Sequence, residues 1–107
     1  LTMFAFITNI RAKPGQRAAL ATLTQTMMEQ TATERGVPVY VFHQAEDDLD
    51  EFWFYDLYTS EQAYREHCSS DAFNGMISQL GEFGEIKVMH KLMPYGSVKS
   101  AGIPLST

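Results

Sequence analysis

The sequence predicts an α+β fold in which strands and helices follow the order β-α-β-β-α-β. Two observations support this prediction. Short apolar segments rich in aromatic and β-branched residues alternate with longer segments whose apolar residues recur at helical spacing. In addition, 107 residues are enough for one layer of helices over one sheet, and for little more.

The first strand and the first helix are predicted within residues 3–33. Residues 3–10 are apolar, with aromatic and β-branched side chains that are typical of a strand. Pro14 is expected in the first turn of the helix, where its missing N–H costs nothing. Gly36 and Pro38 follow the helix end. An apolar stripe predicts the buried side of this helix: Leu20, Leu23, Met27 and Met28.

Two strands joined by an acidic turn are predicted next. Residues 39–45 form one strand, residues 51–58 form the other, and residues 46–50 form the turn of the hairpin. The second strand of the hairpin carries apolar side chains on both faces: Phe52, Phe54 and Tyr58 on one, and Trp53, Tyr55 and Leu57 on the other. A strand without a polar face needs cover on both sides.

The second helix is predicted in two pieces. Thr59 is expected to cap a short helix that ends near Cys68, with Gln62 completing a capping box. Residues 69–71 are expected to cap a further helix that ends near Leu80. The chain therefore interrupts its second helix with a polar turn.

The last strand, residues 85–93, is stopped by Pro94 and completes a ferredoxin-like arrangement, in which helices cover one face of an antiparallel sheet. We assign residues 1–94 to one domain and residues 95–107 to a C-terminal tail. The tail contains Gly, Ser and Pro without any period, so we expect it to be ordered only against a partner.

The uncovered face of the predicted sheet is too apolar to meet water. We therefore expect two sheets to pack face to face in a homodimer, which makes the fold a dimeric α+β barrel. The alternative is a monomer with one exposed hydrophobic patch, which at this size risks aggregation.

The composition indicates which binding partners and which cellular compartment to expect. The chain carries 8 basic and 13 acidic residues, a net charge of -5, so we expect no nucleic-acid binding. No apolar run approaches the roughly 20 residues that span a bilayer, and the first residues lack the basic region of a signal peptide. The single cysteine, Cys68, fits a reducing compartment. We expect a cytoplasmic protein without membrane contact.

His67 is the leading candidate for chemistry. It lies on the short predicted helix, one turn after Ala63 and Tyr64, which mark an inward face. An imidazole in a cavity between helix and sheet acts as an acid or a base near neutral pH. The alternative is a partly exposed helix residue whose ring bonds a nearby carbonyl.

Each of the other candidate site residues also has an interpretation in which it has no role in function. Asn9, near the end of the first strand, holds a substrate oxygen or an anion, or is an exposed amide. His43 lies in the middle of a predicted strand, where it contacts the substrate or is a core residue with its hydrogen bonds made within the protein. Five aromatic side chains form a flat slot for a ring compound or simply fill the core: Trp53, Tyr55, Tyr58, Tyr64 and Phe73.

No metal and no cofactor are expected. Three histidines and one cysteine match no zinc spacing. The segment Gly81-Glu82-Phe83-Gly84 lacks the spacing and the lysine of a phosphate-binding loop.

An ordered series of short motifs runs along the chain: residues 9–16, the Gly36 turn with Tyr40, residues 54–58, residues 60–67, Ser70 with Phe73, and residues 91–94. In this order they resemble the antibiotic biosynthesis monooxygenase family over residues 3–94. The resemblance implies a ferredoxin-like dimer with a shared barrel. It also implies oxidation of a quinol or an aromatic polyketide by dioxygen, without metal, flavin or other prosthetic group.

The resemblance also implies roles for individual residues. His67 would assist deprotonation of the substrate or hold its hydroxyl, and Asn9 would bind the oxyanion. Tyr64, Trp53 and Phe73 would wall the pocket and exclude water.

Departures from the family pattern leave alternatives. Asp56-Leu57-Tyr58 stands where members often have Glu-x-Trp. The heme-degrading branch is not expected, because His67 and Ile77 stand where its Trp and axial His belong. Another branch isomerises a small phosphorylated signalling molecule and has a histidine at the position of His67. That activity, and a non-catalytic dimer that binds an apolar ligand, are the alternatives to a monooxygenase.

Overall fold

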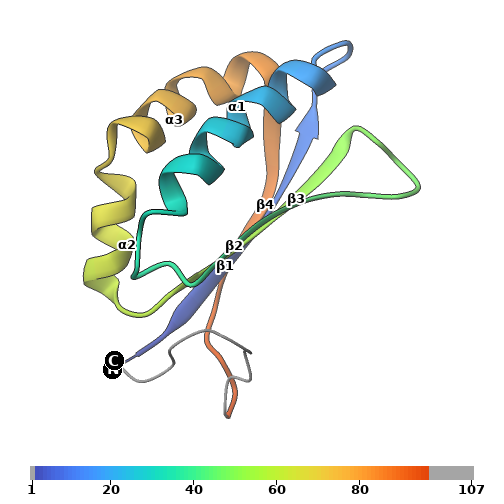
Figure 1. Ribbon diagram of the computed structural model, residues 1–107. Coiled ribbons are helices and arrows are strands. Elements are labelled where there is room, and N and C mark those ends of the chain that lie inside the picture. Colours follow the sequence, from blue (N-terminus) through green and yellow to red (C-terminus); the bar gives the residue numbers. More distant parts are fainter. Residues whose placement is uncertain (1, 97–107) are drawn as a thin grey trace.

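Four strands form one antiparallel sheet, and three helices lie on one of its faces (Figure 1). The computed structural model describes residues 2–96. The strand order β2-β3-β1-β4 confirms the predicted ferredoxin-like α+β fold. Along the chain the elements are β1 (Phe4–Ala12), α1 (Arg17–Thr31), β2 (Val39–Gln44), β3 (Glu51–Tyr58), α2 (Glu61–Cys68), α3 (Asp71–Phe83) and β4 (Gly84–Leu92).

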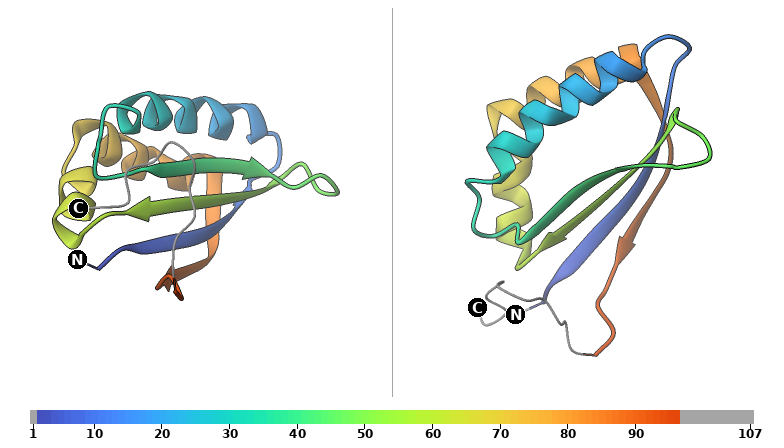
Figure 2. Two further views of the ribbon diagram at one scale, coloured as in Figure 1. Left: turned by 60° about the horizontal axis from the view of Figure 1, so that its bottom comes forward. Right: turned by 45° about the vertical axis from the view of Figure 1, so that its right-hand side comes forward.

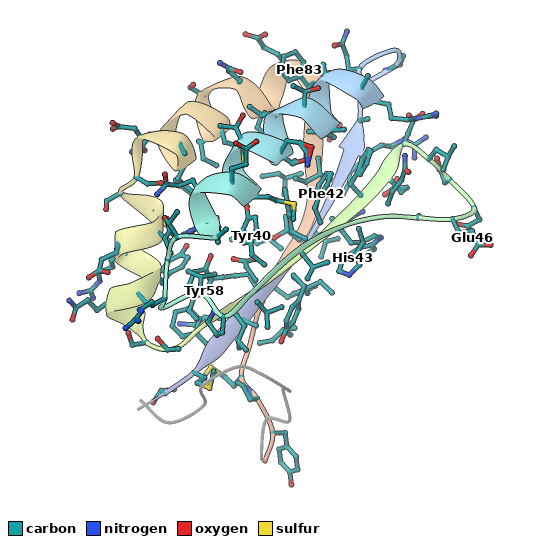
Figure 3. All side chains as sticks on the ribbon, in the orientation of Figure 1. Tyr40, Phe42, His43, Glu46, Tyr58 and Phe83 are labelled. Atoms are coloured by element: carbon teal, nitrogen blue, oxygen red, sulfur yellow. The ribbon has the colours of Figure 1, made fainter. Side chains whose placement is uncertain are left out.

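Side-chain alternation gives the sheet two distinct faces. The helix-covered face of β2 and β3 carries Tyr40, Phe42 and Tyr58, whereas His43 points away from the helices (Figure 3). The two turned views show α1 and α3 side by side over this face (Figure 2). The predicted division of the β3 side chains between two faces is therefore confirmed.

A β-bulge in β4 shapes the helix-covered face. Asn9 pairs with Val88 while Ile10 pairs with Ile86, so Lys87 is the extra residue. The extra residue shifts the alternation of side chains by one position. As a result Ile86 and Met89, three residues apart, both face the helices and both line the same cavity.

The core lies between α1, α3 and the sheet. Leu20 and Met27 are fully buried, as the predicted stripe requires. Thr24 and Thr31 complete the buried side of α1, and their hydroxyls donate to the backbone oxygens of Ala21 and Met27. Intramolecular acceptors allow these polar side chains to be buried at small cost. The main cluster against this helix contains Ile10, Ala12, Leu20, Phe52, Phe54 and Leu80.

Two helix starts differ from the sequence-based prediction. Helix α1 begins only at Arg17, so Pro14 lies in the preceding turn, beside Gly15 with its φ of 76°. Helix α2 is capped by Ser60, whose hydroxyl accepts from the Ala63 N–H at 3.1 Å, and not by Thr59. The Thr59 hydroxyl instead donates to the carbonyl of Gly36 at 3.4 Å.

Helix α3 runs further than predicted. It passes through Gly81 and ends at Phe83. A glycine inside a helix costs only about 1 kcal/mol. Phe83, beyond Gly81, packs against the main cluster, and this burial offsets part of that cost.

Residues 97–107, most of the predicted tail, lie outside the described residues, so the domain boundary at residue 94 stays a prediction. Among residues 2–96, no helix combines the length and the apolar character that crossing a membrane requires.

Gly36 determines how closely the α1–β2 loop approaches α2. A Cβ at this position would collide with the Cβ of Ala63. We expect Gly36→Ala to lower the free energy of unfolding by about 1–3 kcal/mol, because the crowded backbones must separate. Urea denaturation measures this change.

The matched control is Gly75→Ala, in an exposed part of α3 where a Cβ meets nothing within 4 Å. This variant should gain about 0.5–1 kcal/mol. If Gly36→Ala and Gly75→Ala stabilised the protein equally, the close approach of the Gly36 loop to α2 would be contradicted.

Candidate functional site

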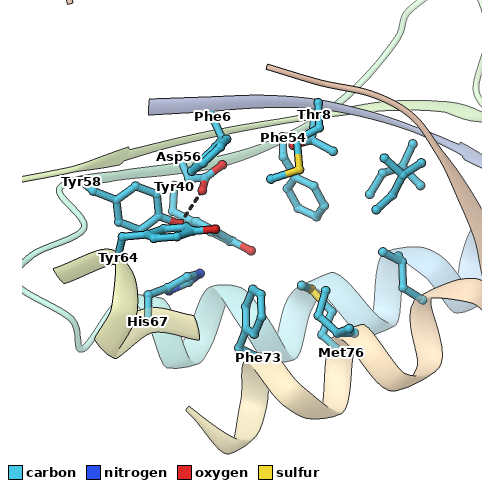
Figure 4. Close-up of a pocket in the computed structure, with 15 residues that line it drawn as sticks. Phe6, Thr8, Tyr40, Phe54, Asp56, Tyr58, Tyr64, His67, Phe73 and Met76 are labelled. Atoms are coloured by element: carbon cyan, nitrogen blue, oxygen red, sulfur yellow. Dashed lines mark hydrogen bonds between the residues drawn. The ribbon is translucent and has the colours of Figure 1, made fainter. Parts of the chain in front are cut away.

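A cavity of about 100 Å³ lies between the helices and the sheet (Figure 4). Its lining comes from all four strands and from α2 and α3, and most of the lining side chains are aromatic or aliphatic. An apolar cavity of roughly 150 Å³ admits a benzene-sized molecule. The volume of this cavity is smaller than that value, so the cavity is at most the size of one aromatic ring.

Half-exposed side chains mark where the cavity opens. Ile77 of α3 is 48% exposed, and Ile86 and Met89 of β4 are 47% and 51% exposed. The other end lies deep, beside Tyr58 and His67, which are 1% and 2% exposed. A ligand that enters between α3 and β4 therefore meets the deep end last.

The deep end is polar. Asp56 and Tyr58, two residues apart on β3, face the cavity together, and the Tyr58 hydroxyl donates to Asp56 Oδ2. Burial raises the pKa of Asp56, although the bond from Tyr58 and the nearby His67 act in the opposite direction. A buried carboxyl with an elevated pKa is a common feature of functional sites.

Three tyrosine hydroxyls surround this carboxyl, those of Tyr40, Tyr58 and Tyr64 (Figure 4). Burial raises the pKa of Tyr40 and Tyr58 above the ordinary phenol value, and the charge of Asp56 acts in the same direction. Burial raises the pKa of Tyr64 to about 12. All three phenols are therefore protonated at neutral pH and serve as hydrogen-bond donors, not as bases.

His67 reaches the deep end from α2. Its Nδ1 lies 2.7 Å from Oε1 of Glu34, in the α1–β2 loop. Its ring packs against those of Tyr40, Tyr58 and Phe73, each with a centroid distance of 5.5 Å. His67 is therefore a buried residue of the cavity, and the sequence-based alternative of a partly exposed histidine bonded to a carbonyl is wrong.

Cys68 follows His67 at the end of α2 and is partly buried. Burial raises the pKa of its thiol, so the thiol is protonated at neutral pH. Cys68 therefore lacks the activation that a nucleophilic cysteine needs.

Four of the predicted site residues line the cavity: Tyr58, Tyr64, His67 and Phe73. The other four, Asn9, His43, Trp53 and Tyr55, lie on the opposite face of the sheet, because their positions in the strands have the other parity. The sequence-based slot that combined Trp53 and Tyr55 with Tyr58, Tyr64 and Phe73 is therefore not formed within the described chain.

The side chain of Asn9 makes hydrogen bonds on that opposite face. Its amide donates to Oε2 of Glu51 at 2.8 Å and to the carbonyl of Phe52 at 3.0 Å. Hydrogen bonds from Asn9 and then Arg11 lower the pKa of Glu51. Asn9 is also buried, so it is not the exposed strand-end amide of the sequence-based alternative.

Two further displaced candidates, His43 and Trp53, are exposed to solvent, and Tyr55 is half-buried. The Nδ1 atom of His43 lies 3.1 Å from the carbonyl oxygen of Trp53. In the described chain His43 is therefore neither a cavity residue nor the core residue of the alternative.

Sequence reasoning missed Tyr40, Asp56 and Glu34 as site residues. The first two had a usable signal, since they share the strand face of Phe54 and Tyr58. Asp56 is in addition the only carboxylate among the apolar side chains between Phe52 and Tyr58. Glu34 had no such signal, because its contact to His67 joins residues 33 positions apart through a loop.

The cavity contains carboxyl, phenol and imidazole groups but no lysine or arginine among its described lining residues. Arg11 instead pairs with Asp48 at 2.9 Å and with Glu51 at 2.6 Å on the opposite face. Arg65 pairs with Glu61 on the exposed side of α2. Within residues 2–96, no three His, Cys, Asp or Glu side chains lie close enough together to hold a metal ion.

The fold and the cavity define a class: small ferredoxin-like α+β proteins with a ring-sized pocket between helices and sheet. The family model for antibiotic biosynthesis monooxygenases matches residues 3–79, so the chain belongs to this family. The resemblance inferred from the ordered motifs is thereby confirmed.

Solved structures agree with this assignment. Rv0793 from Mycobacterium tuberculosis is 25% identical, with a TM-score of 0.83 over 92% of this chain and 100% of that one. SnoaB from Streptomyces nogalater, a cofactor-independent oxygenase, is 11% identical, with a TM-score of 0.78 over 94% of this chain and 100% of that one. At such low identity the likeness to SnoaB shows a shared fold only.

Among curated proteins, the uncharacterized sll1783 from Synechocystis is 26% identical over 84 residues. The match covers 75% of this chain and 57% of the relative, so the chain accounts for little more than half of that protein's length.

The raised pKa of Asp56 predicts a specific pH dependence of stability. The unfolded chain releases the Asp56 proton near its ordinary pKa of about 4, whereas the folded protein retains it to higher pH because the carboxyl is buried. The contribution of Asp56 to stability therefore falls as pH rises through this window and becomes constant above the folded pKa.

We expect the free energy of unfolding of the wild type, relative to Asp56→Asn, to decrease from pH 4 upward and then to level off. Urea denaturation of both proteins at several pH values measures this difference. A difference that grows with pH would mean that the folded environment lowers the pKa of Asp56.

Proposed function

We propose that this protein is a monooxygenase that oxidises a small hydroxylated aromatic compound, of the quinol type, with dioxygen and without a cofactor. The observation that carries the proposal is the cavity: a ring-sized apolar space that ends at a buried histidine, a carboxyl and three phenol donors. Family membership supports an oxygenase-type reaction.

The reaction needs no external reductant. A hydroquinone and one dioxygen molecule give a hydroxyquinone and one water molecule, so the substrate itself supplies the four electrons that reduce O₂. One oxygen atom forms a bond to a ring carbon, and the other leaves as water. Removal of a proton from the substrate hydroxyl makes the ring electron-rich enough to reduce dioxygen.

The deep end supplies the groups for that first proton transfer. In our proposal the substrate ring lies between Phe54 and Phe73, with one hydroxyl directed at His67, which accepts the proton. The Tyr40 and Tyr64 hydroxyls donate hydrogen bonds to the developing phenolate. The apolar walls keep water away from the reactive intermediate.

The cavity chemistry counts against the phosphorylated-metabolite isomerase. A phosphorylated ligand needs cationic or N–H donors around its charge. No lysine or arginine is found among the described lining residues, and the carboxyl groups of Asp56 and Glu34 lie at the deep end. A neutral phenol fits this environment better than a dianion.

The test is oxygen consumption by the purified, metal-free protein with a panel of hydroquinones and anthrone-like phenols. We expect saturable uptake, and we expect His67→Ala to reduce kcat by about 100-fold or more, the typical contribution of general base catalysis. His43→Ala is the matched control, because it removes the same ring from the opposite face of the sheet.

Equal uptake by His67→Ala and by the wild type would remove His67 from the mechanism. No uptake with any substrate, together with retained binding of a phenol, would favour the non-catalytic ligand-binding alternative.

We propose further that the uncovered face of the sheet is a homodimer interface. Val41, Trp53 and Leu92 expose 38%, 37% and 40% of their surface on this face. Monomers rarely leave such a contiguous apolar face in water. In a face-to-face dimer, Trp53 and Tyr55 would contact the partner rather than the substrate.

Trp53→Glu should convert the dimer to a monomer, because it introduces a charge that the apolar interface cannot pair. Light scattering is expected to give twice the chain mass of 12.1 kDa for the wild type and for Trp53→Phe, and the single mass for Trp53→Glu. A wild-type protein of single mass at micromolar concentration would disprove this interface.

A further inference from the structure

We propose that Glu34 is the positioning residue of His67, which it fixes with the proton on Nδ1 and with an unprotonated Nε2 directed into the cavity. This inference rests on the proposed function, in which His67 accepts the proton of the substrate. It adds a residue from outside the cavity lining to the proton-transfer machinery.

The contact itself determines which nitrogen carries the proton. Oε1 of Glu34 lies 2.7 Å from Nδ1 of His67, and the two side chains are only 18% and 2% exposed. A carboxylate only accepts hydrogen bonds, so Nδ1 must donate. In a neutral imidazole the remaining nitrogen, Nε2, then has a free lone pair and acts as a base.

The surroundings leave Nε2 available. Within residues 2–96, Nε2 of His67 has no hydrogen-bond partner. Every fully buried side-chain nitrogen or oxygen in this range does have a partner, so Nε2 is not fully buried. Nε2 is therefore accessible from the cavity that its ring lines (Figure 4). The ring of Phe73 packs against the imidazole at a centroid distance of 5.5 Å and restricts its rotation.

Glu34 is itself held at both oxygens. Its Oε2 accepts from Nε2 of Gln30 at 3.2 Å, while Oε1 faces His67. Its backbone N–H donates to the carbonyl of Thr31 at 2.9 Å. A carboxylate fixed in this way restricts the imidazole that it bonds.

The loop that carries Glu34 is fastened to the start of α2. The Thr59 N–H donates to the carbonyl of Gly36 at 3.0 Å, and Gly36 packs directly against Ala63. The distance between Glu34 and His67 is thus set by the same close packing that brings the loop to the helix.

Asp56, the other carboxyl at the deep end, has a different role. One of its oxygens accepts from Tyr58, and it makes no hydrogen bond to His67 within the described chain. Glu34 is the group that stabilises His67 once the ring is charged: when Nε2 takes the substrate proton, the imidazolium is already paired with a carboxylate. An unpaired buried imidazolium would be costly.

The tautomer of His67 tests the proposal without any substrate. In protein labelled with ¹⁵N at its three histidines, ¹H–¹⁵N correlation spectra at mildly alkaline pH distinguish protonated from unprotonated ring nitrogens, and the His67→Ala variant assigns the signals. We expect His67 with Nδ1 protonated in the wild type. Glu34→Leu should lose this preference.

Glu66→Leu is the matched control, because it removes an exposed glutamate next to His67 that bonds Gln62 instead. It should leave the His67 signals in place. If His67 of the wild type carries its proton on Nε2, the proposal is wrong, whether or not the protein consumes oxygen with quinols.

Kinetics test the catalytic consequence. Glu34→Gln retains an acceptor oxygen for Nδ1 but removes the charge that stabilises the imidazolium, so kcat should fall roughly tenfold or more with little change in KM. An unchanged kcat in an active protein would overturn the positioning role. The expected tautomer together with no oxygen uptake would support the Glu34–His67 pair and disprove the monooxygenase.

Discussion

The alternation of side chains along β3 is the constraint on which the rest of the structure depends. Phe52, Phe54, Asp56 and Tyr58 face the helices, and the residues between them face the other way. A shift of one residue would exchange the two sets and would move the Asp56–Tyr58 pair out of the cavity. Pairing of β3 with both β1 and β2 fixes this register from two sides.

Most of the cavity wall is apolar, and the buried polar groups at its deep end have hydrogen-bond partners. Asp56 and His67 are buried, and each has a partner, Tyr58 for the first and Glu34 for the second. Without these partners each buried group would cost several kcal/mol. The same bonds that make burial tolerable also orient the groups, so stability and chemistry rest on the same contacts.

The ferredoxin-like fold alone does not determine this chemistry. SnoaB shares the fold at 11% identity, a level at which site residues need not correspond. The chemistry of this chain depends on the groups in and beside its cavity, which include the Glu34–His67 contact and no lysine or arginine among the described lining residues. Function therefore follows from these groups and from family membership, and topology alone does not determine it.

Local patterns in the sequence determined the order of the elements, the two faces of β3 and the buried stripe around Leu20 and Met27, because periodicity and capping act over a few residues. They also singled out His67. Only the tertiary structure decided that Asn9 and Trp53 lie on the face away from His67, and that Glu34 contacts it. Such contacts depend on strand pairing, on the bulge in β4 and on a close loop–helix approach, and these bring together residues that no local pattern relates.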